Sequence, residues 1–318
     1  MTTQPEPSTV QRPRRPDIEA AAFRLGDAIR RTPVITLRPE DTGCTVGIVV
    51  KLELLQHSGS FKARGALNSV LSLDTGTSGV CAASGGNHAG AVAWAAQRAG
   101  VTADVFVPAT APPAKIARIA EYGGRAHLVD GFVKDALAAC QDFAGRHGVP
   151  TLHPYDTFET VSGAGTLGLE LEEQVPEAER VVVGCGGGGL FAGLAAALDG
   201  IADVLPVEPR LCPSLATALD AGHPVASAVG GVAVDSLGAP AIGRIAFETA
   251  RERHIASVLV DDEAIVAARR FLWSKLRVLA EPGACVALAA VLSGELDLAA
   301  GQDVVVVVSG GNNESWPN

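Results

Sequence analysis

Lys62 is the residue of this sequence with the clearest potential for chemistry. It lies in HSGSFKARGALNS, where a polar turn that contains Phe61, Lys62 and Arg64 precedes an apolar stretch typical of a helix. A lysine amine becomes a nucleophile or a base when burial and a nearby cation lower its pKa. Such a lysine needs a rigid turn to aim it and other loops to converge on it.

Three glycine-rich segments could supply those loops. They are ASGGNHAG at 83–90, GCGGGGLFAG at 184–193 and VVVVVSGGNNE at 304–314. Each contains or follows an apolar run typical of a buried strand. Loops at the carboxyl ends of parallel strands form the ligand site of an α/β sheet. We therefore expect the three loops to meet.

The segment GCGGGG has the pattern of a phosphate-binding loop. Its backbone N–H groups can turn towards one point, and the following helix directs its positive end there. The segment also fits a dinucleotide fingerprint, because Gly184, Gly186 and Gly189 satisfy G-x-G-x-x-G and Glu208 follows about twenty residues later. A Rossmann NAD(P)-dependent oxidoreductase is thus the alternative from another reaction class, but it leaves Lys62 without a role.

Composition narrows the possible partners. The chain has 318 residues, 47% hydrophobic and 4% aromatic, which suits helices packed on a buried parallel sheet. A net charge of −10 argues against nucleic acid, which needs a basic face. No apolar run reaches the ~18 residues of a membrane helix, so no membrane partner is expected. The six cysteines form no C-x-x-C pair, as expected in a reducing cytoplasm.

Strand-like and helix-like runs alternate, which predicts an α/β fold with mostly parallel sheets flanked by helices. The expected strands are 47–52, 79–83, 103–107, 126–129, 180–183, 204–207, 257–260 and 304–308. The expected helices are 87–99, 112–122, 133–147, 165–174, 191–198, 261–279 and 284–292. Residues 1–16, rich in Pro and Arg, are expected to be a disordered tail.

Taken together, the motifs resemble those of fold type II pyridoxal-phosphate enzymes of the serine/threonine dehydratase family. The resemblance runs in order from residue 58 to residue 314. It implies a two-lobed fold like that of the tryptophan synthase β subunit, and a homodimer. A large cofactor-binding domain would comprise 17–52 and 157–318, and a small substrate-loop domain would comprise 53–156.

The resemblance also implies a role for individual residues. Lys62 would form a Schiff base with pyridoxal 5'-phosphate, and Phe61 would pack against the pyridine ring. Asn87 would hydrogen-bond the ring hydroxyl, and Ser309 would face the pyridine nitrogen. The phosphate would be held by Gly186, Gly187, Gly188 and Gly189. The substrate carboxylate would be bound by Ser84, Gly86, Asn87 and His88.

Three further residues have roles that the sequence leaves open. Gly231, in GVAVDSLG, would contact cofactor or substrate through its backbone. Glu281, in AEPGAC, either lies near the cofactor ring or is a carboxylate at a helix N-terminus. Arg64 either pairs with a phosphate or carboxylate, or forms a salt bridge between the domains.

Departures from the family pattern restrict the activity. Racemases of this group carry a serine where this chain has Gly85, so efficient racemisation is not expected. Ala164 replaces a usual glutamine, which could alter the pocket. Glu208 fits a divalent-metal position but Ser214 stands where an aspartate is expected, so no metal site is predicted, while a monovalent ion stays open.

The prediction is a cytoplasmic ammonia-lyase that eliminates water from L-threonine or L-serine and forms a 2-oxo acid and ammonia. In this reaction Lys62 would remove the proton from the substrate's Cα. The alternative is a lyase of the same kind for another β-substituted or β-hydroxy amino acid, such as hydroxyaspartate.

Overall fold

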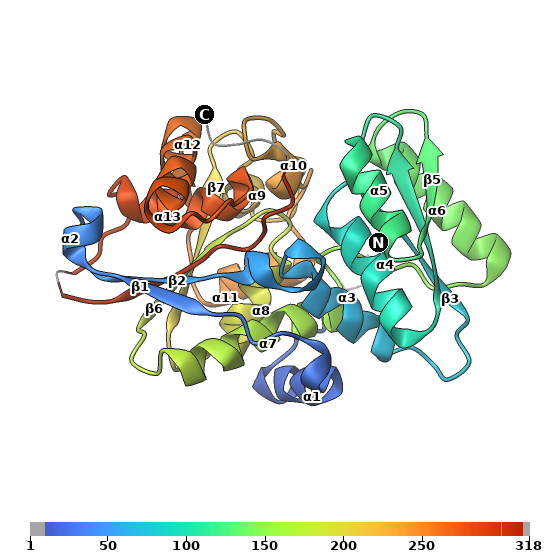
Figure 1. Ribbon diagram of the computed structural model, residues 1–318, viewed down its shortest axis with the longest axis horizontal. Helices are drawn as coiled ribbons and strands as arrows, with labels where there is room; N and C mark the ends of the chain where they lie inside the picture. The colour runs from blue at the N-terminus through green and yellow to red at the C-terminus, as the bar shows by residue number, and fades with distance from the viewer. Residues whose placement is uncertain (1–9, 300, 314–318) are drawn as a thin grey trace, which may run out of the picture.

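The computed structural model describes residues 10–299 and 301–313 and divides the chain between two β-sheets (Figure 1). A six-stranded sheet has the order β1-β2-β9-β6-β7-β8, and a three-stranded sheet has the order β3-β4-β5. The two sheets lie side by side in Figure 1, each flanked by helices. The predicted α/β class with mostly parallel sheets is therefore confirmed.

In the larger sheet only β1 runs antiparallel, in its pairing with β2. Strand β9 lies between β2 and β6, and its four valines are at most 1% exposed, as an uninterrupted apolar run predicts. The strands are β1 (Val34–Leu37), β2 (Ile48–Lys51), β6 (Arg180–Gly184), β7 (Asp203–Pro209), β8 (Val258–Val260) and β9 (Val304–Val307).

Apolar helices cover both faces of the larger sheet. Because side chains alternate along a strand, Val305 and Val307 pack in one cluster with α7 and α8, whereas Val304 and Val306 pack in another with α12 and α13. The helices of this lobe are α1 (Arg15–Leu25), α2 (Pro39–Thr42), α7 (Phe158–Gln174), α8 (Gly189–Ala197), α9 (Ser214–Ala221), α10 (Val234–Leu237), α11 (Arg244–Glu252), α12 (Asp262–Phe271) and α13 (Val286–Leu292).

The smaller sheet is parallel throughout and has its own apolar core. Many core side chains of α4 are alanines, so this helix can pack closely on its neighbours. The elements are β3 (Gly79–Ala83), β4 (Thr102–Pro108), β5 (Arg125–Val129), α3 (Lys62–Leu71), α4 (Asn87–Ala99), α5 (Pro113–Glu121) and α6 (Val133–His147). Among the described residues, no helix is both long and apolar enough to cross a membrane.

The chain passes twice between the two sheets. After β2 it follows two short 3-10 turns, η2 (Glu53–Leu55) and η3 (His57–Gly59), into α3, and it returns between α6 and α7. The glycine-rich loops follow β3, β6 and β9, so all three lie at carboxyl ends of parallel strands, as predicted. The two passages and the three loops are the parts of the fold that form the site.

Several predicted boundaries were wrong. The expected disordered tail overlaps α1, which begins at Arg15 because Asp17 accepts the backbone N–H of Arg14; residues 1–9 lie outside the described part. The expected helix 261–279 is α-helical only to Phe271 and continues as a π-helix to Leu276. The short antiparallel β1 was not predicted.

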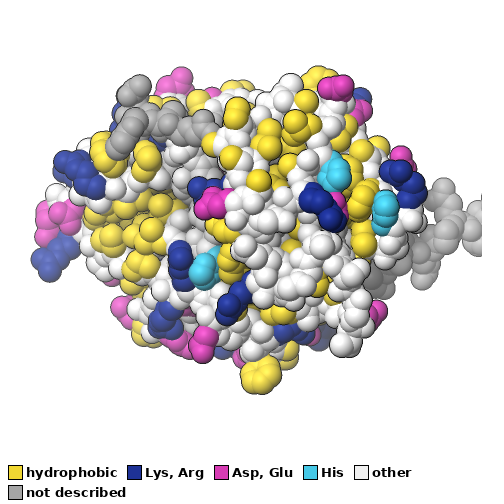
Figure 2. Space-filling model, turned by 45° about the vertical axis from the view of Figure 1, so that its right-hand side comes forward, with side chains coloured by type: hydrophobic (Ala, Val, Ile, Leu, Met, Phe, Trp, Pro, Cys, Tyr) yellow, Lys and Arg dark blue, Asp and Glu magenta, His cyan; other side chains and the backbone are white. Residues whose placement is uncertain are grey.

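Charged side chains are dispersed on the surface. On the face shown in Figure 2, Lys and Arg are scattered among Asp, Glu and hydrophobic side chains. This face therefore offers no continuous basic surface of the kind that binds nucleic acid.

Helices α7 and α8 approach each other through glycines. A Cβ atom on Gly165 would lie 2.7 Å from the carbonyl oxygen of Gly193, and one on Gly193 would lie 2.6 Å from that of Val161. We therefore expect Gly165→Ala to destabilise the protein by about 1–3 kcal/mol, because the helices must separate. Urea unfolding of the purified protein measures the change.

Gly145 provides the matched control, because it lies in α6 and a Cβ there would meet nothing within 4 Å. Gly145→Ala should leave stability unchanged or raise it by up to about 1 kcal/mol, since alanine is the better helix former. Equal effects of the two substitutions would contradict the proposed close packing.

Candidate active site

The turn that carries Lys62 is joined to the end of β9. Ser60 forms an antiparallel bridge with Gly310, and the Phe61 backbone N–H donates to the Ser309 carbonyl at 3.0 Å. Lys62 is the first residue of α3. The backbone thus fixes Lys62 beside the SGGN loop, although Ser309 lies 247 residues further along the chain.

The Lys62 amine is enclosed by carbonyl and aromatic groups. Its Nζ donates to the Pro154 carbonyl at 2.6 Å and lies 5.0 Å from the ring centre of Phe61 and 6.0 Å from that of Tyr155. Burial lowers the pKa of Lys62 to about 8, although the charge of Glu281 acts in the opposite direction. An amine with this pKa can take up a proton near neutral pH.

The GCGGGG loop leaves backbone donors available. Among the described residues, no acceptor is hydrogen-bonded to the N–H groups of residues 186–189. Gly188 has a φ of 83°, and a Cβ on Gly187 would lie 2.3 Å from the Tyr155 ring. Side chains are thus excluded from the loop, and free N–H groups at the start of α8 suit a phosphate.

Glu208 and Ser214 lie beneath the glycine loop. The Ser214 hydroxyl lies 2.6 Å from the Gly186 carbonyl and 3.1 Å from a Glu208 carboxylate oxygen. Glu208 also accepts the backbone N–H groups of Leu215 and Ala216 in α9. Because it is wholly buried and committed to α9, Glu208 is not placed to bind a ribose, as the dinucleotide interpretation requires.

Asn87, Glu281 and Asn312 form a second cluster of polar side chains. The Asn87 amide donates to Glu281 Oε1 at 2.6 Å and accepts from Asn312 at 2.9 Å. Glu281 Oε2 is buried and has no hydrogen-bond partner among the described residues. Burial raises the pKa of Glu281 to about 7. Of the two roles left open by the sequence, Glu281 does stand at a helix N-terminus, because it precedes the 3-10 turn Pro282–Cys285, but its side chain bonds Asn87 and does not cap that turn.

The remaining predicted substrate residues lie on the loop after β3. The Ser84 hydroxyl accepts the N–H of Gly86 at 3.2 Å, which shapes the turn before α4. His88 is buried, its Nε2 lies 3.1 Å from the Leu152 carbonyl, and burial lowers its pKa to about 3. His88 is therefore neutral at physiological pH.

A cleft of about 350 Å³ opens beside this turn. Gly86, Asn87 and Asn312 line it, and Lys115 of α5 and Asp235 of α10 form an ion pair on its wall. Gly231 does not line this cleft; it has a φ of 78° and packs against Leu211 and Asp262. Its segment reaches the site through Asp235 instead.

Sequence reasoning missed several residues of the site. Pro154 and Tyr155 come from the return passage, Asp235 from α10 and Lys115 from α5 of the smaller lobe. The segment of Asp235, GVAVDSLG, was expected to contact the site, but a backbone carbonyl and an ion pair between lobes leave no signature in a single sequence.

Together these groups fit a phosphate-bearing aromatic cofactor. The free N–H groups of the glycine loop suit its phosphate, the Lys62 amine suits covalent attachment, and the Phe61 ring and the Asn87 amide suit contacts with its ring. Known proteins agree with this geometry. The family model "Pyridoxal-phosphate dependent enzyme" matches residues 25–310.

Individual relatives cover nearly the whole chain. The phenylserine dehydratase of Ralstonia pickettii is 35% identical over 308 residues, covering 94% of each protein. The L-threonine ammonia-lyase of Thermotoga maritima is 35% identical, covering 93% of this chain and 75% of that protein. The structure of maize serine racemase matches with a TM-score of 0.90 and 31% identity, over 96% of this chain and 95% of that chain.

The chain belongs to the pyridoxal-phosphate-dependent enzyme family. This confirms the family, the two-lobed fold type and the cofactor expected from the four motifs. The dinucleotide interpretation of GCGGGG was wrong. Four glycines before a helix suit the phosphate of pyridoxal phosphate as well as that of a dinucleotide, and only the other loops distinguish the two cofactors. In this pyridoxal-phosphate-dependent enzyme Lys62 lies between the SGGN loop and the return passage.

We expect Glu281→Gln to lower the pKa of Lys62 below about 8, because the carboxylate charge raises that pKa in the native protein. The amine would then become neutral at lower pH. The rate at which an amine-acetylating reagent labels Lys62 in the cofactor-free protein, followed by mass spectrometry across a pH series, measures the shift.

Asp104→Asn is the control, because Asp104 is a buried carboxylate of the other sheet, paired with Arg125 and His127. Its loss should leave the Lys62 labelling profile where it was. A Glu281→Gln profile that coincides with the native one would show that Glu281 does not act on the amine.

Proposed function

We propose that this enzyme eliminates water from L-threonine and L-serine, releasing ammonia and 2-oxobutyrate or pyruvate. The observation that carries this proposal is the enclosed Lys62 amine, which lies beside the SGGN loop, 2.6 Å from the Pro154 carbonyl, with its pKa lowered to about 8. A base with such a pKa is suited to removing a proton from Cα near neutral pH. The names of the relatives, two of which are ammonia-lyase and dehydratase, support the same reaction class.

Bound pyridoxal phosphate would supply an electron sink that makes the proton on Cα acidic. Lys62 is the residue that would hold it covalently, with Phe61 against the ring and the glycine loop on the phosphate. Ser309 is neutral, so it would not keep the pyridine nitrogen protonated. Asn87, held by Glu281 and Asn312, would hydrogen-bond the ring hydroxyl.

The chain's own groups would position the substrate. The N-terminus of α4 offers backbone N–H groups for the substrate carboxylate, next to the Ser84 hydroxyl. His88 is neutral because its pKa is lowered to about 3, so its ring would line the carboxylate site without adding a charge. The Nζ of Lys62 would take up the Cα proton, and the hydroxyl would leave from Cβ as water, which consumes one proton and so balances the one gained by the lysine. The released enamine would tautomerise to an imine, and water would hydrolyse the imine to the 2-oxo acid and ammonia, so atoms balance without an oxidant or a reductant.

A second candidate is a β-hydroxy amino acid with a larger side chain. The relative named phenylserine dehydratase supports it, and so does Tyr155, an aromatic ring 6.0 Å from the Lys62 amine. Hydroxyaspartate, which carries an acidic side chain instead of an aromatic one, is the further substrate to compare. Comparing kcat/KM for these substrates with the values for threonine and serine decides between the candidates.

The domain division, location and assembly belong to this proposal. The two sheets suggest domains close to 17–52 with 157–318 and 53–156. Six free cysteines, five of them buried, support a reducing cytoplasm. The family resemblance supports a homodimer that acts on a small amino acid.

The first test is release of 2-oxo acid from L-threonine and L-serine by the cofactor-loaded protein. We expect turnover by the native protein and a loss of at least about 10³-fold with Lys62→Ala, because proton transfer depends on that amine. Lys62→Ala should also lose the visible absorbance of lysine-bound cofactor. Native absorbance without release from either substrate would refute the substrates but keep the cofactor site.

Gly85 gives a second test, which concerns racemisation. A Cβ there would lie 3.6 Å from Ala111 and Pro108, so a serine fits. We expect native protein to form little D-serine from L-serine, and Gly85→Ser to form at least about 10-fold more, because a hydroxyl could then return a proton to the opposite face.

Gly85→Ala is the matched control, since it adds the Cβ without the hydroxyl. Chiral chromatography of the products measures both variants. Equal D-serine formation by the alanine and serine variants would rule out the hydroxyl as the proton donor.

A further inference from the structure

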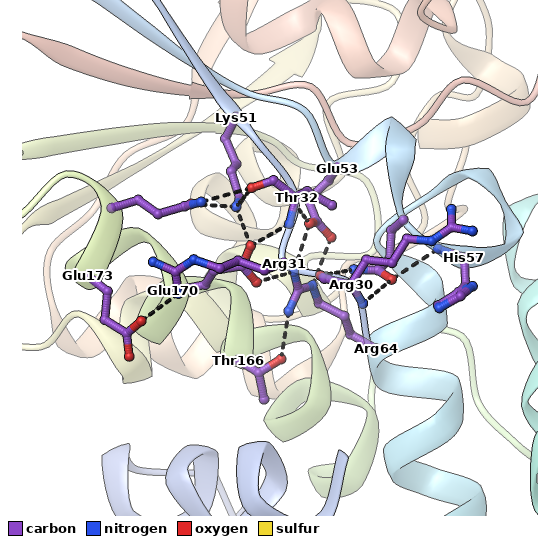
Figure 3. Close-up of polar contacts among 12 residues, drawn as sticks. Arg30, Arg31, Thr32, Lys51, Glu53, His57, Arg64, Thr166, Glu170 and Glu173 are labelled. Carbon is purple, nitrogen blue, oxygen red and sulfur yellow. Dashed lines mark hydrogen bonds and ion pairs between the residues drawn. The ribbon is translucent and has the colours of Figure 1, made fainter. Parts of the chain in front are cut away.

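Arg64 lies two residues after Lys62, in the first turn of α3, and is almost completely buried. Its guanidinium binds Glu53 through two nitrogens, each at 2.8 Å, and Glu170 at 2.6 Å. Its remaining terminal nitrogen lies 3.3 Å from the Thr166 hydroxyl. Figure 3 shows these contacts converging on one side chain.

Those partners come from different parts of the fold. Glu53 lies in η2, where the chain leaves β2, whereas Glu170 and Thr166 lie on α7, in the larger lobe. Arg64 therefore ties the start of the lysine-bearing helix both to the outgoing passage and to the long helix beneath the larger sheet.

The network continues beyond Arg64 and is balanced in charge. Buried Lys51 donates to Glu170 at 2.5 Å and to the Thr32 carbonyl at 2.7 Å. Thr32 in turn donates its hydroxyl to Glu53 at 2.6 Å. Two cations, Lys51 and Arg64, thus face two carboxylates, Glu53 and Glu170, with none of the four charges left unpaired (Figure 3).

These contacts decide between the two roles left open for Arg64. Its donors are already directed at protein acceptors in the interior, so it is not placed to bind a phosphate or a substrate carboxylate. Burial raises the pKa of Glu53, but the charge and hydrogen bonds of Arg64, the hydrogen bond from Thr32 and the charge of Lys51 together lower it below its usual value.

Stability alone is a weak reason for such a network. Apolar side chains of similar size often stabilise a core as well as buried ion pairs do. The planar fork of arginine differs from them because it fixes distance and angle to two carboxylates at once. Two residues before Arg64 on the same helix, Lys62 must hold its Nζ within a fraction of an ångström to act on Cα.

We propose that Arg64, through its fork to Glu53 and Glu170, is a positioning residue that sets the orientation of Lys62 in the active site. Only the kinetic test of this inference rests on the proposed function, because it needs a substrate that the enzyme turns over. Its spectroscopic readout needs no turnover, so failure of the proposed substrates would leave the test intact.

The test compares Arg64→Lys and the double variant Arg64→Met/Glu53→Gln with the native full-length, cofactor-loaded protein. Lysine keeps the charge but can reach only one carboxylate well, and the double variant removes one cation and one carboxylate together. The measurements are the pH titration of the visible absorbance, visible circular dichroism, the melting temperature, and kcat and KM.

We expect the titration midpoint and the circular dichroism of both variants to differ from those of the native protein. Their kcat should fall roughly 10- to 100-fold, with KM little changed, because the base rather than substrate binding is displaced. Arg64→Lys should lie between the native protein and the double variant.

Gln174→Met is the matched control. Gln174 belongs to the same network, but among the described residues its side chain hydrogen-bonds to Lys51 and Thr32 and not to α3. It should lower the melting temperature without changing the titration or the circular dichroism. If Gln174→Met shifts these signals as much as the Arg64 variants do, or if every folded Arg64 variant keeps the native signals, the network is purely structural and the proposal is overturned. Arg64→Lys decides the question alone if the double variant does not fold.

Discussion

The active site depends on a short antiparallel contact between the lysine turn and the end of β9. The Ser60–Gly310 bridge and the Phe61–Ser309 hydrogen bond join segments from opposite ends of the chain. Because both are backbone contacts, they fix the turn whatever the side chains do. The return passage then places the Pro154 carbonyl and Tyr155 against the lysine amine. The low polarity of this enclosure is what makes the amine reactive.

The active site also requires segments that pack directly against backbone atoms. Glycines make this possible at two places in the protein. In the GCGGGG loop, Gly187 leaves room for the Tyr155 ring and Gly188 for Ala246. Between α7 and α8, Gly165 and Gly193 let two helices touch at their backbones. The first pair lets the loop pack closely on its neighbours, and the second holds the α8 helix that follows the loop.

Apolar runs made most strands predictable, since a parallel strand buried on both faces has an uninterrupted apolar sequence, as 304–308 shows. The motif residues Lys62, Asn87 and Ser309 could be named because local sequence defines their loops. Tyr155 and Asp235 could not, because their importance arises only where distant segments meet. Strand β1 has four residues and sits at the edge of the sheet, too short for a clear pattern. The ion pairs of Arg64 with Glu53 and Glu170 likewise could not be predicted from the sequence, because only the fold brings these residues together.

The position of β9 has a consequence for how the protein is made. This strand occupies an inner place in the larger sheet, between β2 and β6, yet it is formed by residues 304–307. During synthesis, the smaller sheet and its helices can assemble from one continuous stretch of chain. The β1–β2 hairpin must wait, with one edge unpaired, until residues 304–307 have left the ribosome. The nascent chain therefore carries an exposed strand edge while about 250 further residues are made, which is the state in which chaperones protect a protein from aggregation.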